Sequence, residues 1–301
     1  MARRDYVLVD VFTDRMFGGN PLAVFPDGNG IDTVTMQTIA AELNLSETVF
    51  VVEPDDAAHA CRLRIFTPKR EMPIAGHPTV GTGWVLQDLG RISAGGQVIF
   101  EEGVGPIPVT LRDMDGAINV EMQQPVPTFG AVFDDRSMLA AMLSLPEDAI
   151  RVDVPAQVVS AGVPFLYIPL VGLAAMRDVQ LRLDLFAELW AGQDPIDIFV
   201  LTTETEDPAA TVHSRMFAPT MNIPEDPATG AASGPLGAYL VTHGLVSAED
   251  APQMIGEQGY EMGRPSRIGI HVTTDGTTIS RVSISGTAVP VGGGWINLSA
   301  E

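Results

Sequence analysis

The sequence predicts an α+β protein made of two similar halves. A motif repeats, because Arg64-Ile65-Phe66-Thr67-Pro68 returns 151 residues later as Arg215-Met216-Phe217-Ala218-Pro219. Strand-like and helix-like stretches also follow one another in the same order in both parts of the chain. Chance would rarely keep several positions in register without a gap. The positions that share the spacing are Arg64/Arg215, Phe66/Phe217, Pro68/Pro219, Pro73/Pro224 and Gly83/Gly234.

Length and composition agree with two globular halves. The chain has 301 residues, of which 46% are hydrophobic and 18% charged, so it can bury a sizeable core and its length favours about two domains. The net charge of -21 argues against nucleic acid and anionic membranes as partners, since phosphate binding is driven mainly by cations. It leaves a small anionic substrate open, because helix N-termini can form a positive pocket in an acidic protein.

In the first half, apolar and β-branched runs predict strands, and helical spacing of apolar residues predicts helices. Gly18 to Pro21 make a turn between the first two strands, and Gly90 ends the second helix. The predicted strands are 6–12, 22–25, 46–52, 61–66 and several within 97–122, and the predicted helices are 33–43 and 78–89.

The second half repeats this scheme after a boundary at Gln123 to Pro127. We therefore expect domains at 1–124 and 125–286, and the C-terminal tail, about 287–301, is a candidate to pack back on the N-terminal half. A polar helix follows the boundary. The other elements expected are strands near 158, at 165–169, 198–201, 215–219, 268–272, 278–285 and 287–291, and helices at 185–190 and 231–242.

Two segments could suggest targeting or a membrane span. The N-terminus reaches Asp5 without an apolar core, so it is not expected to be a secretory signal. The uncharged stretch from 154 to 176 is long enough to cross a membrane, but Pro155, Gly162 and Pro164 divide it into strand-length pieces. We therefore predict strands of a core here.

Two scarce residue types limit the chemistry. Lys69 is the only lysine, so a pyridoxal phosphate enzyme would have to form its Schiff base in the polar stretch Lys69-Arg70-Glu71, which disfavours that cofactor. Cys61 is the only cysteine, so no intrachain disulfide can form and a reducing cytoplasm suffices. Cys61 lies in a predicted strand, and a thiol without a catalytic role is the expected interpretation.

Each half places a small, glycine-rich helix start after a proline-rich loop. These starts are Gly76-His77-Pro78-Thr79 and the segment from Asp226 to Ser233. The first N–H groups of a helix lack internal partners, and small side chains allow a ligand to approach them, so both starts could hold a carboxylate. The alternative is that Asp226 is an N-cap and the glycines serve helix packing.

Glu47 and His77 are the candidate proton-transfer groups. Glu47 begins an apolar strand with only Ser46 and Thr48 as polar neighbours, so partial desolvation is expected to raise its pKa toward the range of a general acid or base. An exposed strand-end glutamate is the alternative, and His77 could equally be a histidine with a structural partner. The other histidines have no ligand spacing, so no metal site is expected.

Several ordered motifs carry a family resemblance. They are Asp10 to Thr13 with Phe17 to Val24, Leu45 to Phe50, Arg64 to Pro68 with Ala75 to Thr79, Glu225 to Ala232, and Glu257 to Ser266. Over nearly its full length the chain resembles the PhzF-like isomerases of phenazine biosynthesis, relatives of diaminopimelate epimerase. The resemblance implies two pseudo-symmetric domains, each a curled mixed β-sheet or barrel around a central helix, with the active site in a cleft between them.

The resemblance also implies residue roles. Glu47 would be the principal acid/base, with His77 and Asp226 completing the proton-handling site. The implied substrate-binding residues are Asn20, Ser46, Gly76, Gly230 and Ala231. The founding activity is isomerisation of trans-2,3-dihydro-3-hydroxyanthranilate by a proton shift, with neither cofactor nor metal, and a cytoplasmic homodimer is expected by family resemblance.

The epimerase and proline racemase relatives use two cysteines, and neither helix start carries one here. Two-thiol racemisation is therefore excluded, and carboxylate chemistry remains. The leading hypothesis is a cofactor-independent isomerase that transfers a proton on a small carboxylate-bearing substrate. The alternatives are a non-catalytic small-molecule binding protein of the same fold, and a lyase or hydrolase that uses Glu47 as its base.

Overall fold

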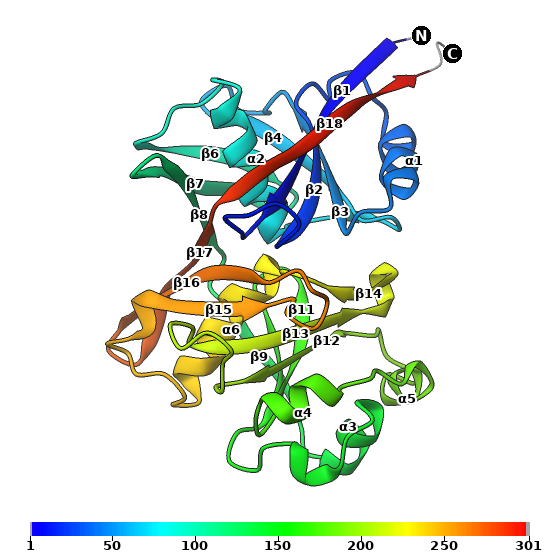
Figure 1. Ribbon diagram of the computed structural model, residues 1–301, viewed down its shortest axis with the longest axis vertical. Coiled ribbons are helices and arrows are strands. Elements are labelled where there is room, and N and C mark those ends of the chain that lie inside the picture. The colour runs from blue at the N-terminus through cyan, green and yellow to red at the C-terminus, as the bar shows by residue number, and fades with distance from the viewer. Residues whose placement is uncertain (1, 299–301) are drawn as a thin grey trace. The chain divides into compact units, whose positions relative to one another are not determined.

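The computed structural model describes residues 2–298 and divides into two compact units (Figure 1). Unit 1 consists of the described residues up to Gln124 together with those from Ser283 onward, and unit 2 runs from Pro125 to Val282. The chain therefore leaves unit 1, builds unit 2 and returns. Strands outnumber helices in both units, and each unit has one long helix in its middle.

Unit 1 is a mixed sheet that curls around α2. Its helices are α1 (Thr33–Leu43) and α2 (Gly76–Asp88). Its strands are β1 (Ala2–Val11), β2 (Asn20–Phe25), β3 (Glu47–Val52), β4 (Cys61–Phe66), β5 (Glu71–Met72), β6 (Gly96–Glu102), β7 (Gly105–Met114), β8 (Ala117–Gln124), the end of β17 (Thr278–Gly286), and β18 (Ala288–Leu298).

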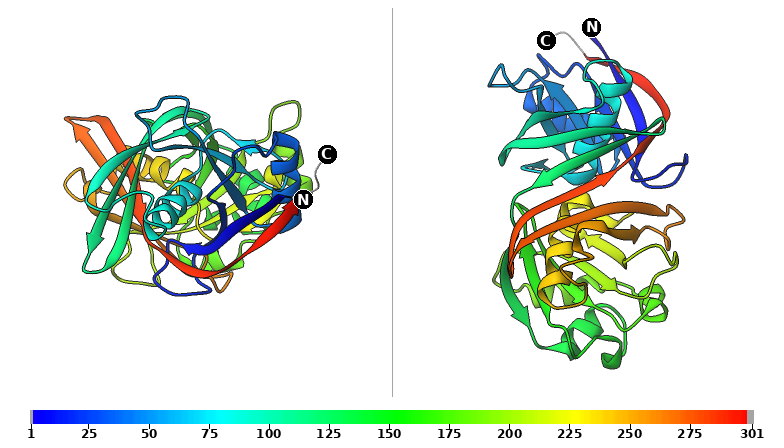
Figure 2. Two further views of the ribbon diagram at one scale, coloured as in Figure 1. Left: turned by 90° about the horizontal axis from the view of Figure 1, so that it is seen from above. Right: turned by 90° about the vertical axis from the view of Figure 1, so that its left-hand side faces the viewer.

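The strand pairings bring the sheet of unit 1 back to its starting edge. β18 pairs with β1, and the pairing then passes through β2, β3, β4, β6 and β7 to β8. β8 also pairs with β17, which leads into β18. Figure 2 shows β1 and β18, blue and red, side by side along the unit. The tail thus packs against the first strand.

Glycines allow α2 to lie inside this sheet. A Cβ at Gly81 would stand 2.6 Å from a Leu22 methyl and 2.7 Å from a Val11 methyl. A Cβ at Gly83 would stand 2.9 Å from a methyl of Val120. The absence of side chains on this face permits close approach of the helix to three strands.

Helix α1 covers the outside of unit 1. Asp32 caps its N-terminus by accepting the Thr35 N–H, and Asn44 ends it in the left-handed region at φ 51°. Its buried residues, Met36, Ile39 and Ala40, pack with a cluster that includes three phenylalanines. The phenylalanines are Phe25, Phe50 and Phe66. The predicted helix 33–43 is confirmed at both ends.

Unit 2 has α6 (Gly230–Thr242) in its middle and three short helices outside, which are α3 (Arg136–Met142), α4 (Leu173–Asp178) and α5 (Leu183–Leu189). Its strands are β9 (Thr128–Phe133), β10 (Ala156–Ser160), β11 (Pro164–Pro169), β12 (Asp197–Thr202), β13 (Val212–Ala218), β14 (Ile223–Asp226), β15 (Met254–Gln258), β16 (Ser266–Asp275) and most of β17. Short 3-10 turns lie at Glu147–Ala149, Pro219–Met221 and Ala251–Gln253.

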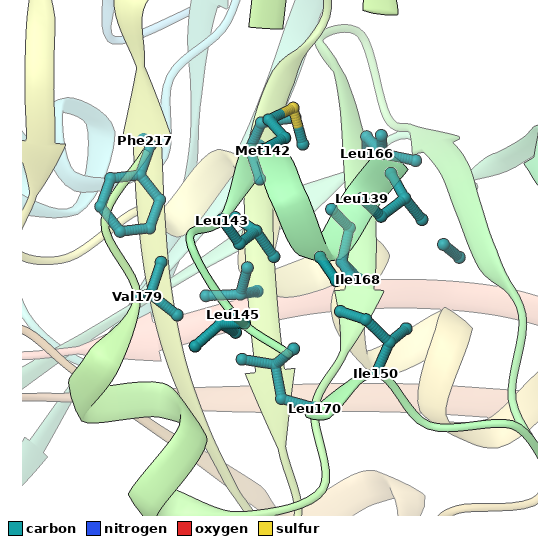
Figure 3. Packing of buried hydrophobic residues seen from close by; sticks show 14 of the residues in the cluster. Leu139, Met142, Leu143, Leu145, Ile150, Leu166, Ile168, Leu170, Val179 and Phe217 are labelled. Carbon is teal, nitrogen blue, oxygen red and sulfur yellow. The ribbon is translucent and has the colours of Figure 1, made fainter. Parts of the chain in front are cut away.

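The outer helices of unit 2 cover an apolar cluster on the sheet (Figure 3). Leu139, Met142 and Leu143 come from α3 and its end, while Leu166 and Ile168 come from β11. The uncharged stretch from 154 to 176 contains β10 and β11, and the burial of most residues in these two strands explains its composition. Among the described residues, no helix has the length and apolarity needed to span a membrane.

Both units use the same series of strand pairings, which confirms that the halves are similar. In unit 1 the series from β1 to β7 is antiparallel, parallel, antiparallel, parallel, antiparallel. In unit 2 the series through β10, β11, β12, β13, β15 and β16 is the same. The registers match as well, since Val49 pairs with Ile65 and Phe199 with Met216.

The spacing of 151 residues does not continue into the central helix. β14 is two residues longer than β5, and α2 begins at Gly76 while α6 begins at Gly230, a spacing of 154. Gly83, whose Cβ would lie 3.7 Å from Val109 of β7, therefore corresponds to Gly237, whose Cβ would meet Ile270 of the equivalent strand β16. The sequence pairing of Gly83 with Gly234 was wrong by one helical turn.

The repeated Arg-x-Phe motif belongs to the scaffold of both units. Arg215 makes two hydrogen bonds to Glu225, at 2.8 and 2.9 Å, and its guanidinium lies 5.0 Å from the Phe217 ring centroid. Arg64 pairs with Glu71 and lies 5.4 Å from the Phe66 ring centroid in the same manner. The motif ties a strand to the loop before each central helix.

Candidate active site

A buried polar cluster lies at the start of α2 in unit 1. His77 Nδ1 is 3.2 Å from Glu47 Oε2 and 3.2 Å from Asn20 Nδ2. His77 is 2% exposed, Glu47 9% and Asn20 0%. The structure thus brings together three of the residues singled out in the sequence.

Three elements position these side chains. Asn20 is the first residue of β2 and Glu47 the first of β3, and these strands pair in parallel with Leu22 opposite Glu47. His77 is the second residue of α2, whose N-cap Ala75 offers no side-chain hydrogen bond. The first N–H groups of α2 therefore have no capping side chain, and the helix dipole is positive there.

The protonation of His77 is set by burial. Desolvation lowers the pKa of His77 to about 3, so the ring is neutral at physiological pH. Nδ1 of a neutral ring carries either one hydrogen or one lone pair. It can donate to an ionised Glu47, or accept from a protonated Glu47 or from the Asn20 amide. Neutral His77 can therefore hydrogen-bond either protonation state of Glu47 by changing its tautomer, and the two states differ by one proton.

The second ring nitrogen of His77 faces a different situation. Nε2 is buried and makes no hydrogen bond within residues 2–298. Buried polar atoms are nearly always hydrogen-bonded in folded proteins, and exceptions are concentrated at functional sites. A substrate atom is one partner that would satisfy it.

Asp226 belongs to a separate polar cluster in unit 2. It is 4% exposed, ends β14, and accepts a 2.6 Å hydrogen bond from the Thr229 hydroxyl. Gln258 donates to the Asp226 carbonyl at 2.7 Å and to the Thr229 hydroxyl at 3.0 Å. The N-cap of α6 is Thr229, so the alternative in which Asp226 caps the helix is wrong.

The remaining candidates lie beside these clusters. Ser46 is half-buried and precedes Glu47, and Gly76 is buried and precedes His77. Gly230 is buried and Ala231 half-buried in the first turn of α6, directly after Thr229. Each set is assembled within its own unit.

The internal repeat shows which polar groups the fold itself requires. By the matching registers, Asp197 of β12 corresponds to Glu47, and it is held by the backbone N–H and hydroxyl of Thr220 at 3.1 and 2.5 Å. Val163 and Ala231 correspond to Asn20 and His77. Unit 2 thus folds without this cluster, and the Asn20-Glu47-His77 arrangement in unit 1 is an addition to the common fold.

Sequence reasoning missed a second repeated cluster. Glu101 contacts His59 at 2.7 Å and accepts the N–H groups of Asp55 and Asp56. Glu257 likewise contacts His213 at 2.7 Å and accepts the N–H groups of Glu206 and Asp207. The shared pair Glu101-Glu102 and Glu257-Gln258 was the signal that could have revealed it.

His213 differs from His77 in its charge. Burial alone would lower the pKa of His213, but hydrogen bonds to Glu257 and Glu261 raise it to about 9. His213 is therefore a charged structural group.

Cys61 is buried, and desolvation with the nearby Glu102 and Glu101 raises its pKa to about 12, so its thiol is not an active nucleophile. In the described chain, no three His, Cys, Asp or Glu side chains are grouped to hold a metal ion.

The comparisons with known proteins identify the family of the chain. A family model described as phenazine biosynthesis-like protein, PhzC-PhzF, matches residues 9–294. The chain belongs to this family. An uncharacterized isomerase of Mesorhizobium japonicum is 39% identical, with 98% of this chain and 99% of the relative covered. Members of the family are isomerases by name, and this chain is an isomerase of the PhzF family.

Two further relatives extend the comparison. The trans-2,3-dihydro-3-hydroxyanthranilate isomerase of Pseudomonas fluorescens is 33% identical, with 98% of this chain and 99% of the relative covered. The crystal structure of a PhzF-family protein of Bacillus anthracis has a TM-score of 0.88 at 28% identity, covering 99% of this chain and all of the other. The PhzF-like fold is therefore present over the whole chain.

Proposed function

We propose that this PhzF-family protein is a cofactor-independent isomerase that moves a proton between two atoms of a small carboxylate-bearing substrate. The observation that carries the proposal is the buried Glu47-His77 contact of 3.2 Å, which one copy of the repeated fold has and the other lacks. A group that the fold does not need, in a site with little water, is a candidate for chemistry.

In the proposed reaction Glu47 is the acid/base. Its ionised carboxylate takes a proton from one substrate carbon, and the protonated form returns a proton to another atom of the same substrate. Burial at 9% exposure limits loss of that proton to water. His77, which is neutral, would orient the Glu47 carboxyl through Nδ1 and meet the substrate with Nε2.

We propose that backbone N–H groups and polar side chains, rather than lysine or arginine, bind the substrate. The open N–H groups of Gly76 and His77 at the start of α2 suit a carboxylate. Asn20 and Ser46 are proposed as hydrogen-bonding residues. In unit 2 we propose that Asp226 takes part in proton handling and that Gly230 and Ala231 bind substrate. An amino-carboxylate related to trans-2,3-dihydro-3-hydroxyanthranilate is the proposed class, by analogy with the Pseudomonas enzyme.

The test is deuterium uptake from D2O, followed by mass spectrometry, for wild type and Glu47→Gln. The panel consists of anthranilate-like compounds, including trans-2,3-dihydro-3-hydroxyanthranilate, and amino-acid carboxylates. Isomerisation with label uptake in wild type alone would support the proposal. Loss of a fragment from the substrate would indicate a lyase or hydrolase instead. If compounds bind but none of them takes up deuterium, the result would indicate a binding protein.

A further inference from the structure

Glu102, the last residue of β6, is a buried carboxyl that the proposed reaction does not use. It is 5% exposed, and its Oε1 lies 2.5 Å from the hydroxyl of Thr79. Its Oε2 accepts the N–H of Ala75 at 3.4 Å. The Thr79 hydroxyl is also 2.6 Å from the carbonyl oxygen of Ala75. Ala75 and Thr79 flank His77, so these contacts fix the turn that carries it.

The number of hydrogens decides the protonation of this cluster. A hydroxyl has one hydrogen, and a carbonyl can only accept, so Thr79 must donate to Ala75. The Thr79 oxygen must then accept from Glu102, and only a protonated carboxyl can donate. An ionised Glu102 would take the hydroxyl hydrogen and leave two oxygens 2.6 Å apart without a hydrogen between them.

Unit 2 contains the neutral counterpart of this arrangement. β4 pairs Arg62 with Glu101, and β13 pairs His213 with Glu257, so the next residues, Glu102 and Gln258, occupy equivalent positions. Ala75 and Thr229 are equivalent as the N-caps of α2 and α6.

The contacts of the two residues correspond on the acceptor side. Gln258 Oε1 accepts the N–H of Thr229 at 3.1 Å, as Glu102 accepts that of Ala75, while Gln258 Nε2 donates on its other side. Gln258 thus acts as a donor and an acceptor at this position, although it donates to the Asp226 carbonyl and the Thr229 hydroxyl and not to the counterpart of Thr79. An amide supplies both in unit 2, and a protonated carboxyl supplies both in unit 1.

We propose that Glu102 is a protonated, neutral acid in the working protein and a positioning residue, which fixes the turn from Ala75 to Thr79 and so holds His77 against Glu47. The expected effect of Glu102 on turnover rests on the proposed function. The expected effect of Glu102 on the turn from Ala75 to Thr79 does not depend on that function.

The surroundings of Glu102 agree with a neutral group. Burial raises the pKa of Glu102 to about 7, against the opposing effect of the hydrogen bonds that Thr79 and Ala75 would donate to an ionised carboxylate. The titratable groups nearby are the Cys61 thiol on β4, neutral below about pH 12, the Glu101 carboxylate on β6, and the neutral His77 on α2. The loop before α2 brings Pro73 against Gly103 of the β6–β7 turn, and none of its charged residues is among the causes of the Glu102 pKa shift. None of these groups is a cation that would stabilise an ionised Glu102.

The sign of the pH effect follows from the raised pKa. Below the ordinary glutamate pKa of 4.5, Glu102 is protonated in the folded and the unfolded chain. Between 4.5 and about 7 only the unfolded chain loses the proton, so the stability that Glu102 contributes is lost as pH rises through this window. Above it the carboxylate is ionised in the fold.

The test measures thermal denaturation of wild type, Glu102→Gln and the reciprocal variant Gln258→Glu from about pH 5 to about pH 8.5. We expect the Tm of Glu102→Gln to rise relative to wild type with increasing pH. The Tm of Gln258→Glu should fall relative to that of wild type over the same pH range, because this variant places a buried acid at the equivalent position in unit 2. Parallel wild-type and Glu102→Gln curves would overturn the proposal.

Positioning is tested by amide hydrogen exchange at Ala75, His77 and Thr79, corrected for the intrinsic rate at each pH. Protection should fall severalfold above about pH 7 in wild type and stay constant in Glu102→Gln. If turnover depends on Glu47, turnover should decline at a pH that is higher by at least about one unit in Glu102→Gln than in wild type. Constant wild-type protection, or an unmoved limb, would contradict positioning. Failure of the isomerase assay alone would remove only the proposed function.

Discussion

At the scale of single residues, Glu47 and His77 have different proposed roles, since Glu47 transfers the proton and His77 orients Glu47. We predict that Glu47→Gln lowers turnover at least about a hundredfold while substrate still binds, because an amide keeps the shape of the carboxyl but accepts no proton. Single-turnover rates and calorimetric binding would measure the two effects. Unchanged turnover would exclude Glu47 as the base. His77→Asn should lower turnover by a smaller factor than Glu47→Gln.

His77 also predicts a pH dependence of stability. Its folded pKa of about 3 lies below the ordinary value of 6.5, so the unfolded chain binds a proton first as the pH falls. The stability contributed by neutral His77 is present above pH 6.5 and falls by about 1.4 kcal/mol per pH unit below it. His77→Asn should therefore gain stability relative to wild type between about pH 6 and pH 4, as measured by urea unfolding. A constant difference would show that His77 ionises in the fold.

Glu102 shows why residue-scale prediction from the sequence was incomplete. Glu47 and His77 could be identified because they interrupt apolar or glycine-rich segments. Glu102 stands before Gly103 like any polar residue at a strand end, and its burial depends on the parallel pairing of β4 with β6, which local sequence does not display. The tight contact of Gly103 with Pro73 became apparent only in the fold.

At the scale of elements, the packing of α2 inside its sheet can be tested at Gly81. The Cβ of Gly81→Ala would meet Leu22 at 2.6 Å, and overpacking of this kind costs about 1–3 kcal/mol. Gly96→Ala, which adds its methyl in open space on β6, is the matched control and should be neutral or slightly stabilising. Equal stabilities in chemical denaturation would show that α2 can shift outward at no cost.

The repeated arginines provide a second element-scale test. Arg215 is buried and also donates to the carbonyls of Met176 and Val179, at 2.7 and 3.2 Å. Arg215→Ala removes these hydrogen bonds and leaves the Glu225 carboxylate without its arginine, which we expect to cost about 3–5 kcal/mol. Arg64→Ala, at the more exposed copy, should cost about 1 kcal/mol or less. Similar losses of unfolding free energy for the two variants in urea denaturation would contradict this prediction.

Sequence patterns predicted the elements unevenly, for physical reasons. The helices of unit 1 were found because apolar residues recur at helical spacing in α1 and Gly90 follows α2. α4 was missed because it has six residues and lies within a continuous apolar stretch. The change of spacing from 151 to 154 was missed because the longer β14 adds residues in a loop rich in proline.

At the scale of the whole molecule, unit 1 is discontinuous in sequence and unit 2 is continuous. We predict that residues 125–282 fold as an isolated fragment, while residues 1–124 alone do not, because they lack β18 and the end of β17. Adding residues 283–301 as a peptide should restore structure. Circular dichroism and amide dispersion in NMR would measure both fragments, and a folded 1–124 fragment would contradict the prediction.

The duplication also determined how much of the fold the sequence could predict. Two similar halves were recognisable because the Arg-x-Phe motif recurs where the chain needs the same ion pair and ring contact twice. The positions at which the copies differ, such as Glu47 against Asp197 or Glu102 against Gln258, acquire meaning only once strand registers align them. Functional asymmetry was therefore hidden until the pairing was known.

The antiparallel pairing of β1 with β18 has a mechanical consequence. Ala2 lies opposite Leu298, so the two ends of the described chain are neighbours at the same end of one ladder. Force applied between them would open the ladder one residue pair at a time, as in a zipper, with little resistance from shear. Unit 1 would yield first, and unit 2, inserted between its two segments, would bear tension only afterwards.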